Sequence, residues 1–288
     1  MALPDVLDLL VCPHCRQSFQ LVGEGRSVRC RNGHAFDLAR QGYLNLQSGR
    51  SPRNADTAAM VAARDRFLSG GHYRPILERL LELVRDQVVV APRVLEVGAG
   101  TGYYLAGLLE GLAGARGVAL DVSLPATRRA ARAHPQLGGV VADVWQPLPV
   151  GDACCDLVVD VFAPRNAVEF RRALAGPPVT AEPPGVLAVV TPEPDHLEQL
   201  RGLLGLLDIQ RDKQDQLHET LGVSFTRQSE DRVSFDLTLD AAAVYDLVAM
   251  GPNAFHSDEK QLRRSLLAVP LPARVSAAVN ISIWRPRP

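Results

Sequence analysis

One stretch decides the fold of this chain: Arg93-Val94-Leu95-Glu96-Val97-Gly98-Ala99-Gly100-Thr101-Gly102-Tyr103-Tyr104. An apolar run with β-branched residues is followed by three glycines at alternate positions, and residues 103–112 are then compatible with a helix. This order predicts a strand, a tight turn and a helix. Glycines in such a turn let backbone N–H groups approach a ligand without a Cβ in the way. The stretch therefore predicts a nucleotide-binding turn at the end of a strand.

An acidic residue follows the glycine turn at the sequence spacing of about twenty residues that is typical of nucleotide-binding sites. A second apolar run, residues 117–120, ends at Asp121, where a carboxylate can accept hydrogen bonds from ribose hydroxyls. An NAD-binding turn would place its third glycine at position 103, which is a tyrosine here. The observed spacing instead resembles the first motif of class I S-adenosylmethionine-dependent methyltransferases. This implies that the cofactor lies over Gly98 and Gly100 and that Asp121 holds its ribose. The alternative is a glycine-rich turn that binds nothing.

Length and composition indicate one large globular domain with a small one. The chain has 288 residues, 47% of them hydrophobic, and a net charge of −1. No apolar run reaches the roughly eighteen residues of a membrane span, and the N-terminus lacks a basic region followed by an apolar core. We therefore expect no membrane partner and a cytoplasmic location. Five cysteines, two of them adjacent, favour reduced thiols or metal ligands over a disulfide framework.

Three of the cysteines form a zinc-binding pattern with a histidine. Cys12 and Cys15 have C-x2-C spacing, and after fourteen intervening residues Cys30 and His34 have C-x3-H spacing. Two short turns that each present a pair of such ligands can form the tetrahedral site that zinc prefers. Because all four positions are filled by protein, the expected Zn²⁺ is structural, and its binding supplies folding free energy to a module with few large apolar side chains. The alternative is three free cysteines in a loop-rich segment. His14, inside the first turn, is expected to lie on the surface.

The same region is strongly basic. Residues 16–53 contain seven arginines and two acidic residues, a net charge of about +5. Clustered arginine on a small module is typical of a surface that binds the phosphates of RNA or DNA. The alternative is a solvated face that touches nothing.

The chain is expected to have three parts. Residues 1–48 are predicted to be a zinc-binding RNA-recognition domain, residues 49–90 a linker with leading helices, and residues 91–288 an α/β, Rossmann-like methyltransferase domain. Residues 35–46 are expected to close the zinc module. Further helices are expected over 57–68, 73–84, 123–134, 196–207, 241–250 and 258–267. Further strands are expected over 140–143, 156–162 and 185–190, with a closing antiparallel pair at 233–239 and 275–284.

Several candidate site residues follow the ends of these strands. In an open α/β sheet, ligands bind outside the carboxyl ends of the strands, so residues 163–166 and 191–196 are expected to line the reaction cleft. Asp143 follows the third strand, where methyltransferases of this class commonly hold the adenine amino group. Three carboxylates near strand ends could act as a general base, and the sequence does not choose among them: Asp160, Glu193 and Asp195.

Together these motifs resemble one family along almost the whole chain, the zinc-containing 23S ribosomal RNA guanine-N1 methyltransferases. The resemblance is carried by Cys12-Pro-His-Cys15, Cys30-x3-His34-x-Phe36-Asp37, Arg40-Gln-Gly-Tyr43-Leu-Asn45-Leu, Ser69-Gly-Gly-His72-Tyr73, the glycine turn, Val161-Phe-Ala-Pro-Arg165-Asn, Thr191-Pro-Glu-Pro-Asp-His196-Leu and Ala249-Met-Gly-Pro252. Within the family, the chain looks closest to the branch that confers resistance to mycinosylated macrolides such as tylosin and mycinamicin.

The resemblance implies site residues, partners and a target. In the family, the residues that match Tyr73, Gly100, Thr101 and His196 contact S-adenosylmethionine, and those that match the three cysteines and His34 hold zinc. The resemblance further implies a homodimer whose zinc modules flank an RNA cleft. The implied target is a guanine in a 23S rRNA hairpin near the peptide exit tunnel, the guanine conventionally numbered 748. The linker near residues 47–57 differs between the two branches of the family, which modify neighbouring guanines.

Two other functions fit parts of the sequence. One is a small-molecule methyltransferase with an accessory zinc module, but a small substrate would not require the arginine-rich segment. The other is a non-enzymatic zinc-ribbon protein that binds nucleic acid and carries a degenerate methyltransferase domain. The intact glycine turn and Asp121 weigh against this second alternative.

Overall fold

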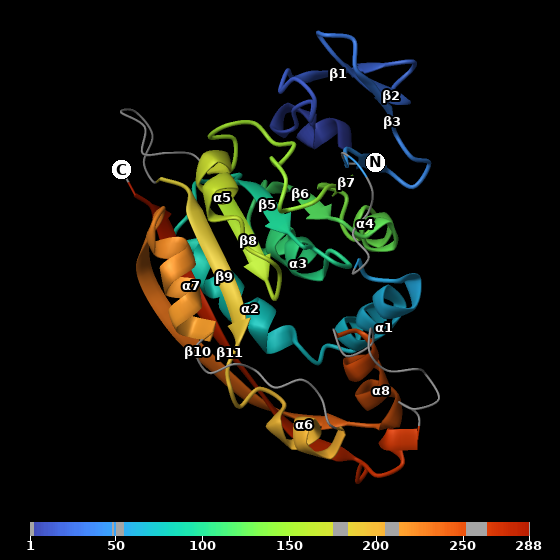
Figure 1. Cartoon of the computed structure of the whole chain (residues 1–288), viewed down its shortest axis with the longest axis vertical. Helices are drawn as coiled ribbons and strands as arrows, with labels where there is room; N and C mark the ends of the chain where they lie inside the picture. The colour runs from blue at the N-terminus through green and yellow to red at the C-terminus, as the bar shows by residue number, and fades with distance from the viewer. Residues whose placement is uncertain are drawn as a thin grey trace.

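The computed structural model describes residues 3–47, 49, 55–174, 184–204, 213–251 and 264–287. Its centre is a mixed eight-stranded sheet with the order β10-β11-β9-β8-β5-β6-β7-β4 (Figure 1). The strands span Tyr43–Asn45 (β4), Arg93–Val97 (β5), Arg116–Asp121 (β6), Leu137–Val141 (β7), Leu157–Val161 (β8), Val186–Pro192 (β9), Phe225–Leu239 (β10) and Ala273–Pro286 (β11). The pairs from β9 to β4 are parallel, and β11 is antiparallel to both β9 and β10. The predicted Rossmann-like fold is confirmed.

The strand order reverses beside β5. From β5 the chain first builds outward through β6 to β7, and it then returns to β8 on the other side of β5 and continues to β9. Open sheets of this kind bind ligands at such a reversal, outside the carboxyl ends of the strands. The glycine turn follows β5, so the topology places it beside the expected ligand crevice.

The closing antiparallel pair is confirmed, but β10 is longer than the sequence predicted. It begins at Phe225 instead of residue 233 and pairs with β11 along its length. Residues 226–230 are all exposed, because β10 is the last strand of the sheet. An exposed edge strand lacks the alternation of apolar and polar residues that reveals a half-buried strand.

Eight α-helices are described. They span Ala58–Ser69 (α1), Arg74–Arg85 (α2), Tyr103–Gly111 (α3), Leu124–Ala130 (α4), Ala167–Ala173 (α5), Glu198–Leu204 (α6), Lys213–Gly222 (α7) and Ala241–Ala249 (α8). The first three match the predicted helices closely, whereas α4 ends at Ala130 instead of residue 134, and α5 and α7 were not predicted. The predicted segments 205–207 and 258–263 lie outside the described residues. None of the described helices has the length and hydrophobicity to cross a bilayer.

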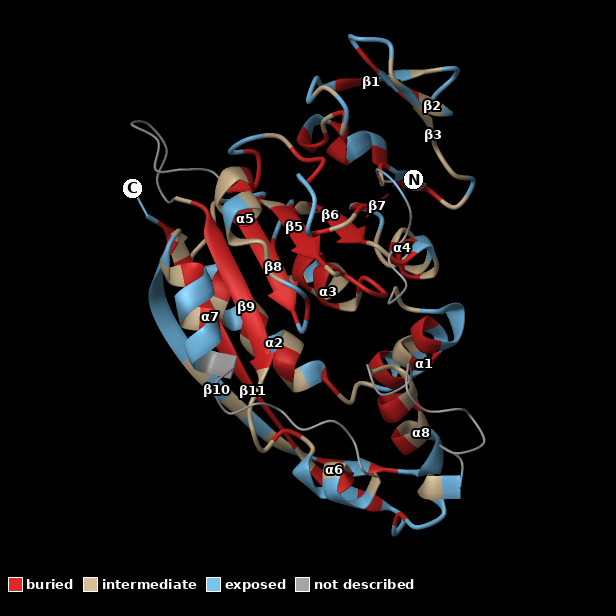
Figure 2. Ribbon diagram, viewed as in Figure 1, coloured by how far each residue is buried: buried red, intermediate tan, exposed pale blue. Residues whose placement is uncertain are grey.

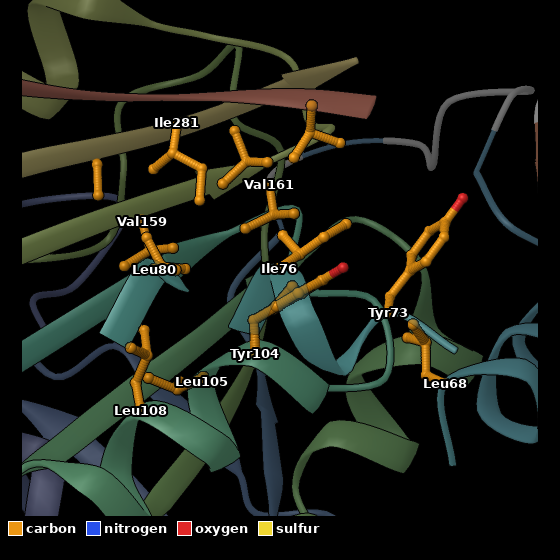
Figure 3. Packing of buried hydrophobic residues seen from close by; sticks show 14 of the residues in the cluster. Leu68, Tyr73, Ile76, Leu80, Tyr104, Leu105, Leu108, Val159, Val161 and Ile281 are labelled. Carbon is orange, nitrogen blue, oxygen red and sulfur yellow. The ribbon is translucent and has the colours of Figure 1, made fainter. Parts of the chain in front are cut away.

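Strands β5 to β9 are almost entirely buried on both faces, whereas much of β10 is exposed (Figure 2). One face packs against α2 and α3, and Figure 3 shows Ile76, Leu80, Leu105 and Leu108 in this cluster with Val159, Val161 and Ile281. The other face packs against α5, α7 and the N-terminal segment. Leu95 of β5 and Val118 of β6 share that second cluster with Leu10 and Cys12. The zinc module is therefore packed on the methyltransferase sheet.

The predicted closure of the zinc module by residues 35–46 is only partly correct. The module is a three-stranded antiparallel sheet of β1 (Phe19–Val22), β2 (Ser27–Cys30) and β3 (Ala35–Asp37). Residues 43–45 instead form β4, which pairs in parallel with β7 at the edge of the large sheet. Leu44 is fully buried there, which the local sequence pattern could not reveal.

Two adjacent glycines in β7 allow close packing on both faces of the sheet. A Cβ at Gly138 would lie 2.4 Å from Val6 Cγ2, in the 3₁₀ helix η1 (Leu3–Leu9). A Cβ at Gly139 would lie 3.1 Å from the Thr127 carbonyl oxygen in α4. The missing side chains therefore fix how closely η1 and α4 approach the strand.

Replacement of Gly138 by alanine should destabilise the chain by about 1–3 kcal/mol, because the added methyl group must displace η1. Chemical denaturation of wild type and Gly138→Ala measures this loss. Gly202→Ala is the matched control: Gly202 lies in α6 with no atom within 4 Å of an added Cβ, so the variant should gain up to about 1 kcal/mol. Equal stability of Gly138→Ala and wild type would contradict the close packing.

Candidate cofactor cavity and zinc site

The glycine turn has the backbone conformation that its sequence predicts. Gly98, Gly100 and Gly102 have φ values of +65°, +55° and +76°, which residues with a Cβ rarely adopt. A Cβ at Gly98 would lie 2.5 Å from the Cβ of Ala163, so the turn also abuts the segment that follows β8. Gly102 is the N-cap of α3. The turn thus presents backbone groups toward the crevice at the reversal of strand order.

Asp121 braces this turn. Its Oδ2 accepts a hydrogen bond from Gly100 N at 2.8 Å, and its Oδ1 accepts one from Ser123 N at 2.7 Å. Burial raises the pKa of this carboxyl, although both N–H donors oppose the shift. Each carboxylate oxygen can accept a further hydrogen bond, so these two hydrogen bonds leave Asp121 able to bind a hydroxyl group.

A cavity of about 840 Å³ lies at the carboxyl ends of the strands. It is lined by all seven of the predicted cofactor contacts: Tyr73, Gly98, Gly100, Thr101, Asp121, Asp143 and His196. These residues come from five regions of the chain that are distant in sequence. A volume of this size suits a nucleoside cofactor and part of a substrate.

Tyr73 and His196 form a buried, uncharged pair in the cavity wall. Tyr73 Oη and His196 Nε2 are 3.1 Å apart, and His196 Nδ1 lies within 3.2 Å of both backbone polar atoms of Ala278. Burial lowers the pKa of His196 to about 4 and raises that of Tyr73. The pair therefore offers hydrogen bonds without charge at neutral pH.

Two buried carboxyl groups lie near the cavity. Glu96 lines it and accepts a hydrogen bond from Leu105 N at 3.1 Å, and burial raises its pKa to about 8. Asp160 is fully buried, and burial raises its pKa to about 7 although Arg165 Nε lies 3.4 Å from Oδ1. Asp160 does not line the cavity.

The other two candidate bases lie beside Arg232 and do not line the cavity. Asp195 accepts a hydrogen bond from Arg232 Nη2 at 2.6 Å, and Glu193 Oε2 lies 3.9 Å from Arg232 Nη1. Neither carboxylate is among the lining residues. In the expected cleft segments, Ala163, Pro164, Arg165, Pro192 and His196 do line it.

Arg64 is a cavity residue that sequence reasoning missed. It reaches from α1 to the glycine turn, where its Nη1 lies 3.1 Å from the position of a Cβ on Gly100. Nη1 pairs with Asp56, and Nη2 donates to the Met250 carbonyl oxygen at 2.7 Å. No local pattern distinguishes Arg64 from Arg66, which pairs with Asp246. Only the docking of α1 beside the turn gives Arg64 this position.

The four predicted zinc ligands converge. Their ligand atoms lie within 4.8 Å of one another. His34 Nδ1 lies 3.4 Å from Cys30 Sγ and 3.5 Å from Cys12 Sγ. The Sγ atoms of Cys15 and Cys30 are 3.6 Å apart. Tetrahedral zinc with bond lengths of about 2.3 Å to sulfur and about 2.0 Å to nitrogen requires separations close to these. The donor set therefore fits a structural Zn²⁺, and His14 is exposed, as predicted.

The zinc module is also tied to the large sheet through Arg16. This residue follows Cys15, and its guanidinium donates to the carbonyl oxygens of Leu148 and Val150 and pairs with Asp152. Four other arginines of the module are exposed: Arg26, Arg29, Arg31 and Arg40. The basic segment thus has one arginine with a structural role and several available to a ligand.

Comparisons with known proteins match two parts of the chain to family models. Residues 10–48 match a zinc-ribbon family described as "RlmA, N-terminal", and residues 95–176 match one described as "Methyltransferase domain". The chain is 43% identical over 286 residues to a 23S rRNA (guanine(748)-N(1))-methyltransferase of Streptomyces fradiae, with 99% of each chain covered. It is 42% identical over 299 residues to a putative 23S rRNA (guanine-N(1)-)-methyltransferase of Micromonospora griseorubida, with 98% of this chain and 99% of the relative covered.

A solved structure shares the fold. It is described as a complex between the Haloferax volcanii Trm112 methyltransferase activator and a putative methyltransferase. The match has a TM-score of 0.51 and 17% identity, and it covers 83% of this chain and 99% of the other. At this identity the likeness supports the fold alone.

Cys30→Ser should abolish stoichiometric zinc binding and destabilise the whole chain by several kcal/mol, because two zinc ligands lie in the core cluster that covers the sheet. Metal analysis and denaturation measure the two effects. Cys154→Ser is the control, since Cys154 is buried but lies outside the zinc cluster, and this variant should retain zinc. Retention of zinc by Cys30→Ser would refute the ligand assignment.

Glu96 should make the stability of the chain depend on pH. Its folded pKa of about 8 lies above the ordinary value of 4.5, so this group's contribution is fully present below about pH 4.5 and is lost as the pH rises toward 8. The loss is at most about 1.4 kcal/mol per pH unit. Glu96→Gln should therefore gain stability relative to wild type between about pH 5 and about pH 8.

Denaturation at several pH values tests this expectation. The control is Glu198→Gln, because Glu198 is exposed at the start of α6. If the two variants show the same pH dependence relative to wild type, Glu96 is ionised in the folded protein and the expectation is wrong.

Proposed function

Because the chain belongs to the family of zinc-ribbon 23S rRNA (guanine-N1)-methyltransferases, we propose that it transfers a methyl group from S-adenosylmethionine to N1 of a guanine in 23S rRNA. The observation that carries this proposal is the match to the Streptomyces fradiae enzyme over 99% of both chains, zinc ribbon included. The finer proposal is that the target is guanine 748, as the name of that relative states for itself.

The cavity suits this chemistry. Methyl transfer from a sulfonium is an in-line displacement, so the protein must mainly align sulfur, methyl and nucleophile and exclude water. S-adenosylmethionine supplies the activated methyl group. Asp121 is proposed to bind the ribose, Asp143 the adenine amino group, and Tyr73, Gly98, Gly100, Thr101 and His196 the rest of the cofactor. N1 loses its proton as the new N–C bond forms, and an ordinary protein base or solvent accepts it.

The zinc ribbon is proposed to bind the RNA backbone. Its exposed arginines suit phosphate contacts, which position an RNA without reading its sequence. RNA bases in loops are reached by splaying them from their stack, and the cavity mouth can then receive the base. The family resemblance further supports a homodimer and a cytoplasmic location, and both remain part of this proposal.

Resistance to mycinosylated macrolides is proposed as the biological consequence. N1 methylation removes a hydrogen-bond donor and adds bulk to the Watson–Crick edge of the guanine. A drug whose sugar packs against this base in the exit tunnel loses both a hydrogen bond and shape complementarity.

The alternative of a small-molecule methyltransferase does not explain the zinc ribbon. Its exposed arginines have no role on a small substrate, and the two relatives at 42–43% identity match through that region. A non-enzymatic role is disfavoured by membership of an enzyme family and by the intact glycine turn with Asp121.

Incubation with labelled S-adenosylmethionine and unmodified 23S rRNA should yield N1-methylguanine at position 748, and primer extension should stop beside it, because the methyl group blocks base pairing. Expression in a drug-sensitive host that lacks its own enzyme should raise the inhibitory concentration of tylosin. A stop at another base would refute the target, and methylation without resistance would refute only the biological role.

A further inference from the structure

Phe162 is an exposed aromatic ring in the wall of the cavity. It follows β8, lines the cavity and is 40% exposed. Its ring centroid lies 6.3 Å from that of Tyr73 and 6.1 Å from that of His196, which are only 3% and 8% exposed. Phe162 is thus the open member of a three-ring cluster whose other two members are buried.

The backbone of Phe162 is strained. Its φ is +55°, in the left-handed region that residues with a Cβ rarely occupy. Its N–H donates to the Val190 carbonyl oxygen at 3.1 Å, and the next residue, Ala163, abuts Gly98. The strain does not bury the ring. Strained residues at a cleft with an exposed apolar side chain commonly serve ligand binding.

Phe162 lies on the flank of the cavity that the predicted adenosine contacts leave open. Asp121 ends β6 and Asp143 follows β7, on one side of β5, whereas Phe162 follows β8, on the other side. The glycine turn between them is in contact with Ala163. A substrate base on Phe162 would therefore meet the cofactor across the turn.

One other exposed aromatic ring shares the cavity. Among the described Phe, Trp and Tyr residues, only Phe162 and Trp145 are exposed. Trp145 is 63% exposed, and its backbone N–H donates to Asp143 Oδ1 at 3.0 Å, so the residue lies on the proposed adenine side. Trp145 is therefore a matched control for Phe162: it is an exposed aromatic residue of the same cavity, but it lies on the adenine side.

We propose that Phe162 is the platform on which the target guanine stacks while its N1 receives the methyl group. This inference rests on the proposed function. Stacking needs only the π face of a base and an exposed aromatic side chain, and it holds a base that has been splayed from the RNA. The open ring, its strained backbone and its position opposite the adenosine contacts are explained together by this role.

The test uses the whole protein and a 23S rRNA hairpin that contains guanine 748. Phe162→Gly removes the ring, and glycine adopts a φ of +55° without strain. The relief of backbone strain should offset part of the stability lost with the ring contacts, so the variant should fold. We expect kcat/KM for the hairpin to fall about 5- to 150-fold. Phe162→Tyr should keep most of the wild-type kcat/KM. In Trp145→Leu, kcat/KM should fall less than in Phe162→Gly. The Kd for S-adenosylhomocysteine should stay within about twofold of wild type in both Phe162 variants, whereas any loss of cofactor affinity should appear in Trp145→Leu.

A direct readout separates stacking from a structural role. The hairpin carries fluorescent 2-aminopurine in place of the target guanine, with S-adenosylhomocysteine present. The fluorescence of the splayed base should be quenched in wild type and in Phe162→Tyr, and it should rise severalfold in Phe162→Gly. Unchanged kcat/KM and fluorescence in Phe162→Gly would overturn the platform while wild-type methylation upholds the proposed function. Failure of wild type to methylate the hairpin overturns the proposed function, and the platform with it.

Discussion

The parallel sheet must be covered by apolar side chains on both faces, and the rest of the structure depends on this constraint. Helices α2 and α3 cover one face. On the other face, much of the cover over β5, β6 and β7 comes from the N-terminal segment, where Leu3, Val6 and Leu10 are fully buried. The zinc ligand Cys12 belongs to that same cluster. The metal-binding module and the methyltransferase sheet are therefore one packed body, and the module holds a fixed position on the sheet.

Several ionisable groups in and near the cavity are held uncharged or lie beside a group of opposite charge. Burial keeps His196 neutral and favours the protonated forms of Glu96 and Asp160. Of the three arginines in the wall, Arg64 pairs with Asp56, Arg165 lies beside Asp160, and Arg201 donates to the Pro194 carbonyl oxygen. Such a site holds a ligand through directed hydrogen bonds and shape more than through net charge. That property suits a cofactor with a positive sulfonium, a carboxylate and a neutral adenosine.

Sequence reasoning succeeded where function depends on local geometry. The glycine turn, Asp121 at a strand end and the spacing of the zinc ligands each follow from a few neighbouring residues, and the structure brings each set together. It failed where long-range docking decides. β4 pairs with the edge of the large sheet and not with the zinc module, and Arg64 reaches the glycine turn from α1. The sequence also does not show that Phe162 lies beside Tyr73 and His196. The carboxylates near strand ends also needed the structure, because proximity in sequence did not show that Asp195 turns toward Arg232.

The pairing of β4 with β7 has a consequence for synthesis on the ribosome. β1, β2 and β3 pair with one another, so the ribbon can close around its metal as soon as residue 37 has emerged. Within the large sheet, β4 has no strand partner until β7 emerges, almost a hundred residues later in the chain, and η1 cannot make its close contact with Gly138 before then. Throughout that interval the nascent chain carries a finished metal site joined to uncovered apolar surface, the kind of surface that chaperones bind. Completion of β7 then ends this exposure by pairing the edge strand and seating η1 against Gly138.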